Sequence, residues 1–178
     1  MPLQSLIKRM FRNLMAVSFL FALTSSAWAQ NKNDVGTFQF EAKQGSHTAH
    51  IIFQTLWFDR NKHRVVIDRR NQTFVDRRPA FGTDGTIPSV EIASIKLYLD
   101  GRQIHIPRRL YADCYQPHFA ALFCKVKLSR NAQVVTVEME GADAAASYTV
   151  RWWFNKNGRH KRTAYQHFSA EDSTGGEV

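Results

Sequence analysis

The sequence predicts an all-β domain, built as a mainly antiparallel β-sandwich of about eight or nine strands. Two observations support this fold class. Apolar and polar residues alternate along most of residues 37–168, which is the pattern of half-buried strands. The dipeptides Asp100-Gly101 and Asn157-Gly158 stand between such segments, and both favour the primed turns of short hairpins. An up-and-down β-barrel is the alternative that the same pattern allows.

The hairpin centred on Asp100-Gly101 is the best-defined element of the sequence. A two-residue loop there predicts the cross-strand pairs Leu99 with Arg102, Leu97 with Ile104 and Ile95 with Ile106. The aliphatic side chains of both strands then share one face. Two strands alone bury too little apolar area to stay folded, so this hairpin must pack against other strands.

The other expected strands follow the same alternation. Segments 37–41, 49–58 and 63–68 are predicted to form a meander, and further strands are expected at 123–128, 135–140 and 148–154. A two-residue loop at Asn157-Gly158 would pair Phe154 with Lys161 and place Trp153 across from Arg162. Residues 69–94 break the pattern, with only 73–75 strand-like, and a connection of this length is often functional.

The N-terminal residues 1–29 are predicted to be a signal peptide. Three basic residues precede an apolar run at 14–23, and Ala27-Trp28-Ala29 supplies the small residues of a cleavage site. We therefore expect a periplasmic or secreted protein cleaved near Ala29, with no membrane-spanning segment afterwards. Residues 30–36 are expected to form a flexible lead-in, 37–168 a single β domain and 169–178 a disordered tail.

The charge of the chain favours anionic partners. Removing Lys8, Arg9 and Arg12 with the signal peptide lowers the formal charge from +9 to +6. The candidates are a polysaccharide, lipopolysaccharide or an acidic protein surface, and nucleic acid is not favoured. The alternative is a basic surface that serves solubility alone.

Two cysteines in an exported chain predict a disulfide between Cys114 and Cys124, because the destination is oxidising. The alternatives are a reactive thiol or half of a metal site. The bond would connect the segment after the first hairpin to the following strand and contribute roughly 2.5–3 kcal/mol.

The irregular region contains a repeated motif, Asp68-Arg69-Arg70 followed by Asp76-Arg77-Arg78. Two arginine pairs on adjoining segments could clamp a phosphate, sulfate or carboxylate, because guanidinium presents a planar fork of donors. The alternative is that each aspartate pairs locally with an arginine at a solvated edge.

A second candidate ligand site surrounds Trp153. Exposed beside Arg151, Lys161 and Arg162, this ring would form a basic aromatic platform suited to sugars, lipid headgroups or a protein partner. The alternative is a structural contact between neighbouring strands.

The sequence lacks local signatures of catalysis. The seven histidines do not show the spacing of metal ligands, no Gly-x-Ser-x-Gly motif occurs, and we expect no cofactor and no metal. The favoured interpretation is an exported binding or accessory module, with an enzyme less favoured. The rival is an exported hydrolase in which His105, His118, Asp113 and Asp59 converge, and the third alternative is a structural or interaction domain.

Overall fold

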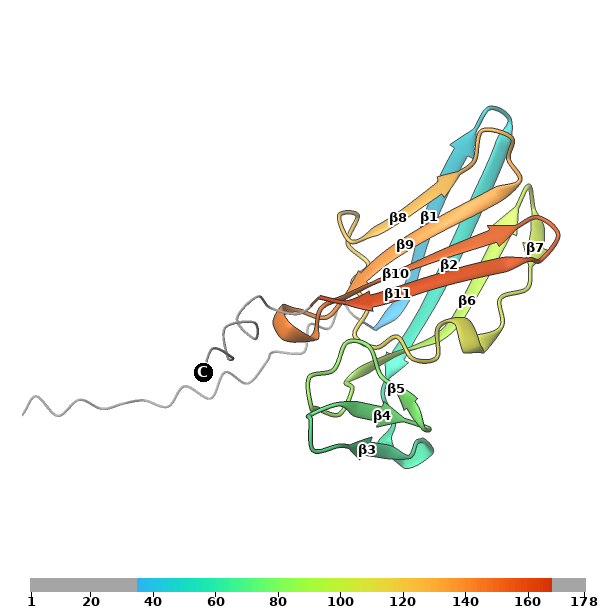
Figure 1. Cartoon of the computed structure of the whole chain (residues 1–178). Coiled ribbons are helices and arrows are strands. Elements are labelled where there is room, and N and C mark those ends of the chain that lie inside the picture. The colour runs from blue at the N-terminus through green and yellow to red at the C-terminus, as the bar shows by residue number, and fades with distance from the viewer. Residues whose placement is uncertain (1–34, 168–178) are drawn as a thin grey trace, which may run out of the picture. The chain divides into compact units, whose positions relative to one another are not determined.

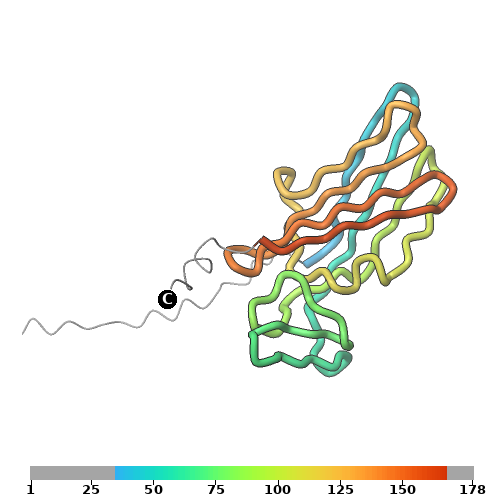
Figure 2. Tube along the Cα trace, viewed as in Figure 1, coloured from blue at the N-terminus to red at the C-terminus, as the bar shows by residue number. Residues whose placement is uncertain are grey.

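The structure is a computed structural model, and it describes residues 35–167 (Figures 1 and 2). Within this range the chain forms eleven strands in three antiparallel sheets and no α-helix. The first sheet has the order β1 (Gly36–Gln44), β2 (His47–Trp57), β6 (Val90–Leu99), β7 (Arg102–Ile104). The second has the order β11 (His160–Gln166), β10 (Tyr148–Asn155), β9 (Val134–Gly141), β8 (Cys124–Leu128). The third has the order β3 (Val65–Ile67), β4 (Thr73–Val75), β5 (Arg78–Pro79).

The two four-stranded sheets share one hydrophobic core. Ile51 and Phe53 of β2 and Leu97 of β6 belong to the same buried cluster as Val137 of β9 and Trp152 of β10. The rings of Phe53 and Trp152 meet across the core at 6.5 Å between centroids. The sheets do not join into a closed barrel, and the shared core is consistent with the predicted sandwich.

The structure confirms the Asp100-Gly101 hairpin. Leu99 pairs with Arg102 and Leu97 with Ile104, and both turn residues have positive φ (51° and 78°), as a type I′ turn requires. The ladder ends at Ile104, so the expected pairing of Ile95 with Ile106 does not form, although both side chains are buried.

The predicted register of the second hairpin is wrong by one residue. Phe154 pairs with His160 and Trp153 with Lys161, because the loop has three residues and not two. The amide of Asn155 donates to the carbonyl of Arg159 at 2.7 Å, and Gly158 takes φ +81° at the end of the loop. A three-residue loop ending in a left-handed residue is the next common hairpin connection.

The predicted meander is also wrong in its third strand. β2 pairs with β1 on one side and β6 on the other, so no edge remains for β3. β3 instead starts the small third sheet beside the ends of β2 and β6, and residues 69–94 supply its other strands. Val65 and Val75 pack there against Phe58 and Tyr115.

The predicted disulfide between Cys114 and Cys124 is absent. Cys114 follows the 3-10 turn η3 (Arg108–Leu110) and bridges to Phe81, whereas Cys124 begins β8 opposite Met139. The segment between the cysteines runs beside β9 and separates them, and both are free and buried. Burial raises the pKa of each thiol to about 12, which opposes the reactive-thiol alternative.

The predicted signal peptide, most of the lead-in and the predicted tail lie outside the described residues, although β1 already begins at Gly36. In the described part of the chain, no helix has the length and apolar character needed to cross a membrane. The same part contains no cluster of three or more potential metal ligands.

Candidate binding surfaces

The two arginine pairs lie at opposite ends of β4. Arg69 and Arg70 occupy the loop before it, where the amide of Asp68 donates to the carbonyl of Gln72 at 3.0 Å. Arg77 lies in the turn after β4 and Arg78 in β5. Because a three-residue strand is about 10 Å long, the pairs border the sheet and do not close on one small anion.

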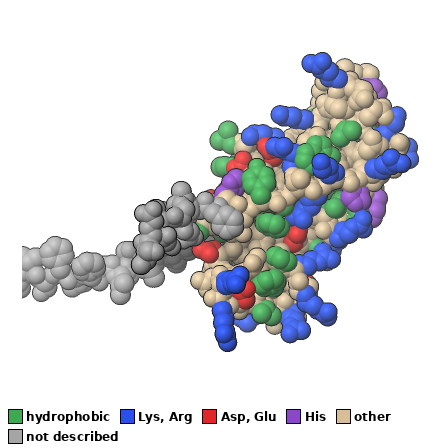
Figure 3. Space-filling model, viewed as in Figure 1, with side chains coloured by type: hydrophobic (Ala, Val, Ile, Leu, Met, Phe, Trp, Pro, Cys, Tyr) green, Lys and Arg blue, Asp and Glu red, His purple; other side chains and the backbone are tan. Residues whose placement is uncertain are grey.

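The outer face of this sheet is apolar. Val66, Phe74 and Pro79 are cross-strand neighbours in one row, and Val66 is 46% exposed. Ile67 is 43% exposed, but it pairs with the buried Thr73 and therefore lies on the opposite face of the sheet. We call this surface the arginine-bordered sheet. It consists of Val66, Phe74 and Pro79 with Arg64, Arg69, Arg70, Arg77 and Arg78, and Figure 3 shows basic side chains around its apolar ones.

The aspartates of the repeated motif do not neutralise these arginines. One oxygen of Asp68 accepts hydrogen bonds from the backbone amides of Arg70 and Gln72, at 2.8 and 2.9 Å. Asp76 likewise accepts from the amide of Arg64 at 3.0 Å. Local Asp–Arg side-chain pairing is therefore wrong. Within residues 35–167, no carboxylate forms an ion pair with any of the five guanidinium groups of this surface.

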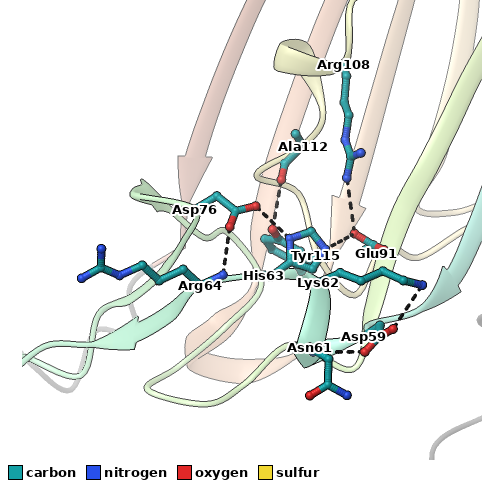
Figure 4. A network of polar contacts seen from close by, with 10 residues as sticks. All are labelled: Asp59, Asn61, Lys62, His63, Arg64, Asp76, Glu91, Arg108, Ala112 and Tyr115. Atoms are coloured by element: carbon teal, nitrogen blue, oxygen red, sulfur yellow. Dashed lines mark hydrogen bonds and ion pairs between the residues drawn. The ribbon is translucent and has the colours of Figure 1, made fainter.

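His63 anchors this sheet to the rest of the domain (Figure 4). Its Nδ1 lies 2.8 Å from Asp76 Oδ2 and its Nε2 3.4 Å from Glu91 Oε2, with the side chain only 9% exposed. Phe58 stacks on the imidazole at 4.8 Å between centroids. Arg108 of η3 reaches the same oxygen of Glu91 at 3.7 Å. The hydrogen bond from His63 is the main cause that holds the pKa of Asp76 below its ordinary value.

Sequence reasoning missed this network, because no carboxylate pair stands at ligand spacing from His63 in the sequence. Both carboxylates reach the imidazole through the fold, from β6 and from the turn after β4. Arg64 was missed as well, although the alternation of residues 63–68 places it on the same strand face as Val66. That pattern was the available signal for a basic border beside an apolar row.

The second surface lies on the outer face of β8–β11. Arg151 and Lys161 approach the ring of Trp153, with 5.8 and 5.3 Å from the charged group to the ring centroid. We call this surface the Trp153 face. An open concavity on it is lined by Lys125, Lys127, Thr136, Glu138, Arg151 and Trp153, and Lys161 completes the surface.

Arg162 does not belong to the Trp153 face. The one-residue change in register turns its side chain to the inner side of the sheet. Its guanidinium donates to both oxygens of Asp113 at 3.0 and 2.9 Å and contacts the sulfur of Cys114 at 3.4 Å. Arg162 therefore pairs with Asp113 on the inner side of the sheet, and the predicted platform retains Arg151, Trp153 and Lys161.

The four residues of the rival hydrolase site are held in separate contacts. Asp113 binds Arg162, and Asp59 lies 3.1 Å from Lys62. His118 approaches Asp143 at 3.9 Å. His105 is exposed, and no hydrogen bond or ion pair joins any two of the four among the described residues.

Comparison of the chain with protein-family models, with curated proteins and with solved structures finds no match.

Proposed function

We propose that the chain is an exported binding module that attaches to anionic lipid of the cell envelope, such as lipopolysaccharide, through the arginine-bordered sheet. One observation carries the proposal: five arginines that form no ion pair with any described residue border an exposed apolar row. Guanidinium groups recognise phosphate through their fork of donors. The apolar row favours a ligand that carries acyl chains as well as phosphate. A phosphorylated lipid therefore complements this surface better than a polysaccharide or an acidic protein surface.

The expected affinity is modest. An arginine near an anionic lipid surface contributes about 1 kcal/mol, so five arginines opposed by Asp68 and Asp76 contribute about 3 kcal/mol. The exposed or part-exposed side chains of Val66, Phe74 and Pro79 add on the order of 2–3 kcal/mol when they leave water. A sum of about 5–6 kcal/mol corresponds to a dissociation constant of roughly 0.1 mM. Such binding is reversible, and it suits a module that recognises an envelope surface without inserting into it.

The test is sedimentation of the mature chain with vesicles of phosphatidylcholine, with and without phosphatidylglycerol, and with lipopolysaccharide aggregates. The double variant Arg69→Ser/Arg70→Ser should weaken binding to the anionic vesicles by roughly 30-fold, from about 2 kcal/mol of lost attraction. Val66→Ser, at an exposed apolar position, should weaken it further. Binding should also fall as salt rises, because surface charges are screened.

The matched control is Arg130→Ser/Arg159→Ser. It removes the same charge from two exposed arginines in turns of the second sheet. Equal loss in both double variants would show that net charge alone drives binding. The proposal would also be contradicted if the chain bound an acidic protein column through Arg69 and Arg70 but did not bind lipid.

A further inference from the structure

The Trp153 face presents a row of side chains across all four strands of the second sheet. Lys127 of β8 pairs with Thr136 of β9, which pairs with Trp153 of β10, which pairs with Lys161 of β11. We propose that this face is a binding site for an acidic polysaccharide. The proposal is independent of lipid attachment, because it concerns a different sheet with different residues.

The spacing of the row suits a chain of sugars. Neighbouring strands lie about 4.8 Å apart, so the row spans about 14 Å from Lys127 to Lys161. The partly exposed indole stands inside it with a cation at each end. The apolar C–H face of a sugar ring can pack on an indole, while carboxylate or sulfate groups bind the ammonium groups. Because the row is built on paired strands, its spacing is fixed before the ligand arrives.

The charges of this face favour an acidic sugar over a neutral one. Glu138 accepts a hydrogen bond from Arg151 Nε at 2.6 Å and holds that guanidinium near the Trp153 ring. Among the described residues, Lys125, Lys127 and Lys161 form no ion pair, so the concavity and its border keep uncompensated positive charge. A neutral sugar would leave these ammonium groups without counterions.

The polar surroundings of Trp153 oppose a lipid ligand at this site. Its cross-strand neighbours are Thr136 and Lys161, and its nearest neighbour on the same strand face is Arg151. Among residues 35–167, no row of aliphatic side chains accompanies the indole, in contrast to Val66 and its neighbours on the third sheet. The two surfaces therefore differ in the class of ligand that each one fits.

The experiment is a calorimetric titration of the mature chain with a short heparin-derived oligosaccharide, with a neutral dextran oligosaccharide as the comparison ligand. Trp153→Ala should weaken heparin binding about tenfold, which is the effect of one aromatic contact. Trp57→Ala is the matched control, because Trp57 is 45% exposed at the end of β2 and should leave binding unchanged. Thr163→Glu adds a negative charge at an exposed position across from Arg151, and it should weaken binding without removing a packed side chain.

Paired charge variants complete the test. Lys127→Ser/Lys161→Ser should weaken heparin binding by at least tenfold, whereas Lys96→Ser/Lys156→Ser, exposed elsewhere, should have little effect. Trp153→Ala should bind phosphatidylglycerol vesicles as the parent chain does, so failure of this proposal and failure of lipid attachment give different results. Equal heparin binding by the Trp153 and Trp57 variants would overturn the proposal. So would dextran binding as tight as heparin binding, or loss of heparin binding in Arg69→Ser/Arg70→Ser alone.

Discussion

Both cysteines should be free thiols that do not react in the folded protein. Cys114 and Cys124 are buried, and burial raises the pKa of each from 9.0 to about 12. At pH 8 a thiol of ordinary pKa is roughly 9% thiolate, whereas a thiol with a pKa of about 12 is roughly 0.01% thiolate. Because the thiolate is the nucleophile, native labelling should be about a thousandfold slower than that of an exposed cysteine, before access is considered.

The assay is a thiol titration with Ellman's reagent at pH 8, on protein purified without reductant. We expect no rapid reaction in buffer and two thiols after unfolding in guanidinium chloride. Cys114→Ser should leave one thiol under the same conditions. Finding none in the unfolded, unreduced protein would show that the cysteines pair, and the arrangement of the crossover described above would then be refuted.

The same burial makes stability depend on alkaline pH. The folded-state pKa values lie above the unfolded value of 9.0, so the unfolded chain releases protons first as pH rises. Each buried, protonated thiol makes its full contribution to the free energy of unfolding below pH 9. This contribution is lost between about pH 9 and 12, at up to about 1.4 kcal/mol per pH unit. Between pH 8 and pH 10, the free energy of unfolding in urea should therefore fall less in Cys124→Ala than in the parent chain. Equal drops would contradict the burial of this thiol.

Three further outcomes follow from the interior contacts. Asp113→Asn should lower the free energy of unfolding in urea by about 2–3 kcal/mol, because it removes one partner of a mostly buried ion pair, whereas Glu138→Gln in a more exposed pair should change it by less than about 1 kcal/mol. Gly82→Ala should lower the melting temperature far more than Gly101→Ala, since a Cβ at Gly82 would lie 2.3 Å from a backbone oxygen, while one at Gly101 meets no atom within 4 Å. Asp76→Asn should be less stable than the parent chain at neutral pH, and this difference in the free energy of unfolding should shrink as pH falls. The reason is that the folded-state pKa of Asp76 lies below the unfolded value of 3.8, so its carboxylate stabilises the fold above pH 3.8 and this stabilisation is lost as pH falls through the folded-state pKa. A gap that widens toward acid pH would contradict this sign.

The two primed-turn dipeptides show how far local sequence determines this fold. Asp100-Gly101 has the predicted pairing because both residues take the positive φ of a two-residue turn. Asn157-Gly158 instead ends a three-residue loop, since the closing hydrogen bond joins Asn155 and Arg159. The dipeptide is compatible with both loops, and only packing of the following strand decides between them. That single residue moved Arg162 from the expected ligand platform to the interior.

The contacts that sequence could not supply are those made between distant segments. Cys114 and Cys124 are close in sequence, yet the crossover between them keeps them apart within one hydrophobic core, with Cys114 beside Phe81 and Cys124 opposite Met139. His63 shows the opposite case, because Glu91 is distant in the chain and adjacent in space. Alternation predicts which face a side chain occupies, but it does not predict which sheet that face meets.

One local device, which appears twice, explains how the arginine-bordered sheet is held. Asp100 and Asp76 are each the first residue of a primed turn. In both, one carboxylate oxygen contacts a histidine Nδ1, and the other accepts a hydrogen bond from the backbone amide of the residue after that histidine, at 2.7 to 3.0 Å. The partner of Asp100 is His47, which is exposed and belongs to the same sheet, so that contact joins two turns of the first sheet and reaches no further. The partner of Asp76 is His63, whose other nitrogen continues to Glu91 of the first sheet. The turn that presents Arg77 is thereby fixed to the main domain, whereas the loop at the far end of β4 has no such tie among the described residues. A ligand that uses all the arginines would therefore meet one end tied to the first sheet through His63, whereas the other end is held by the hydrogen bonds of Asp68 within its own loop.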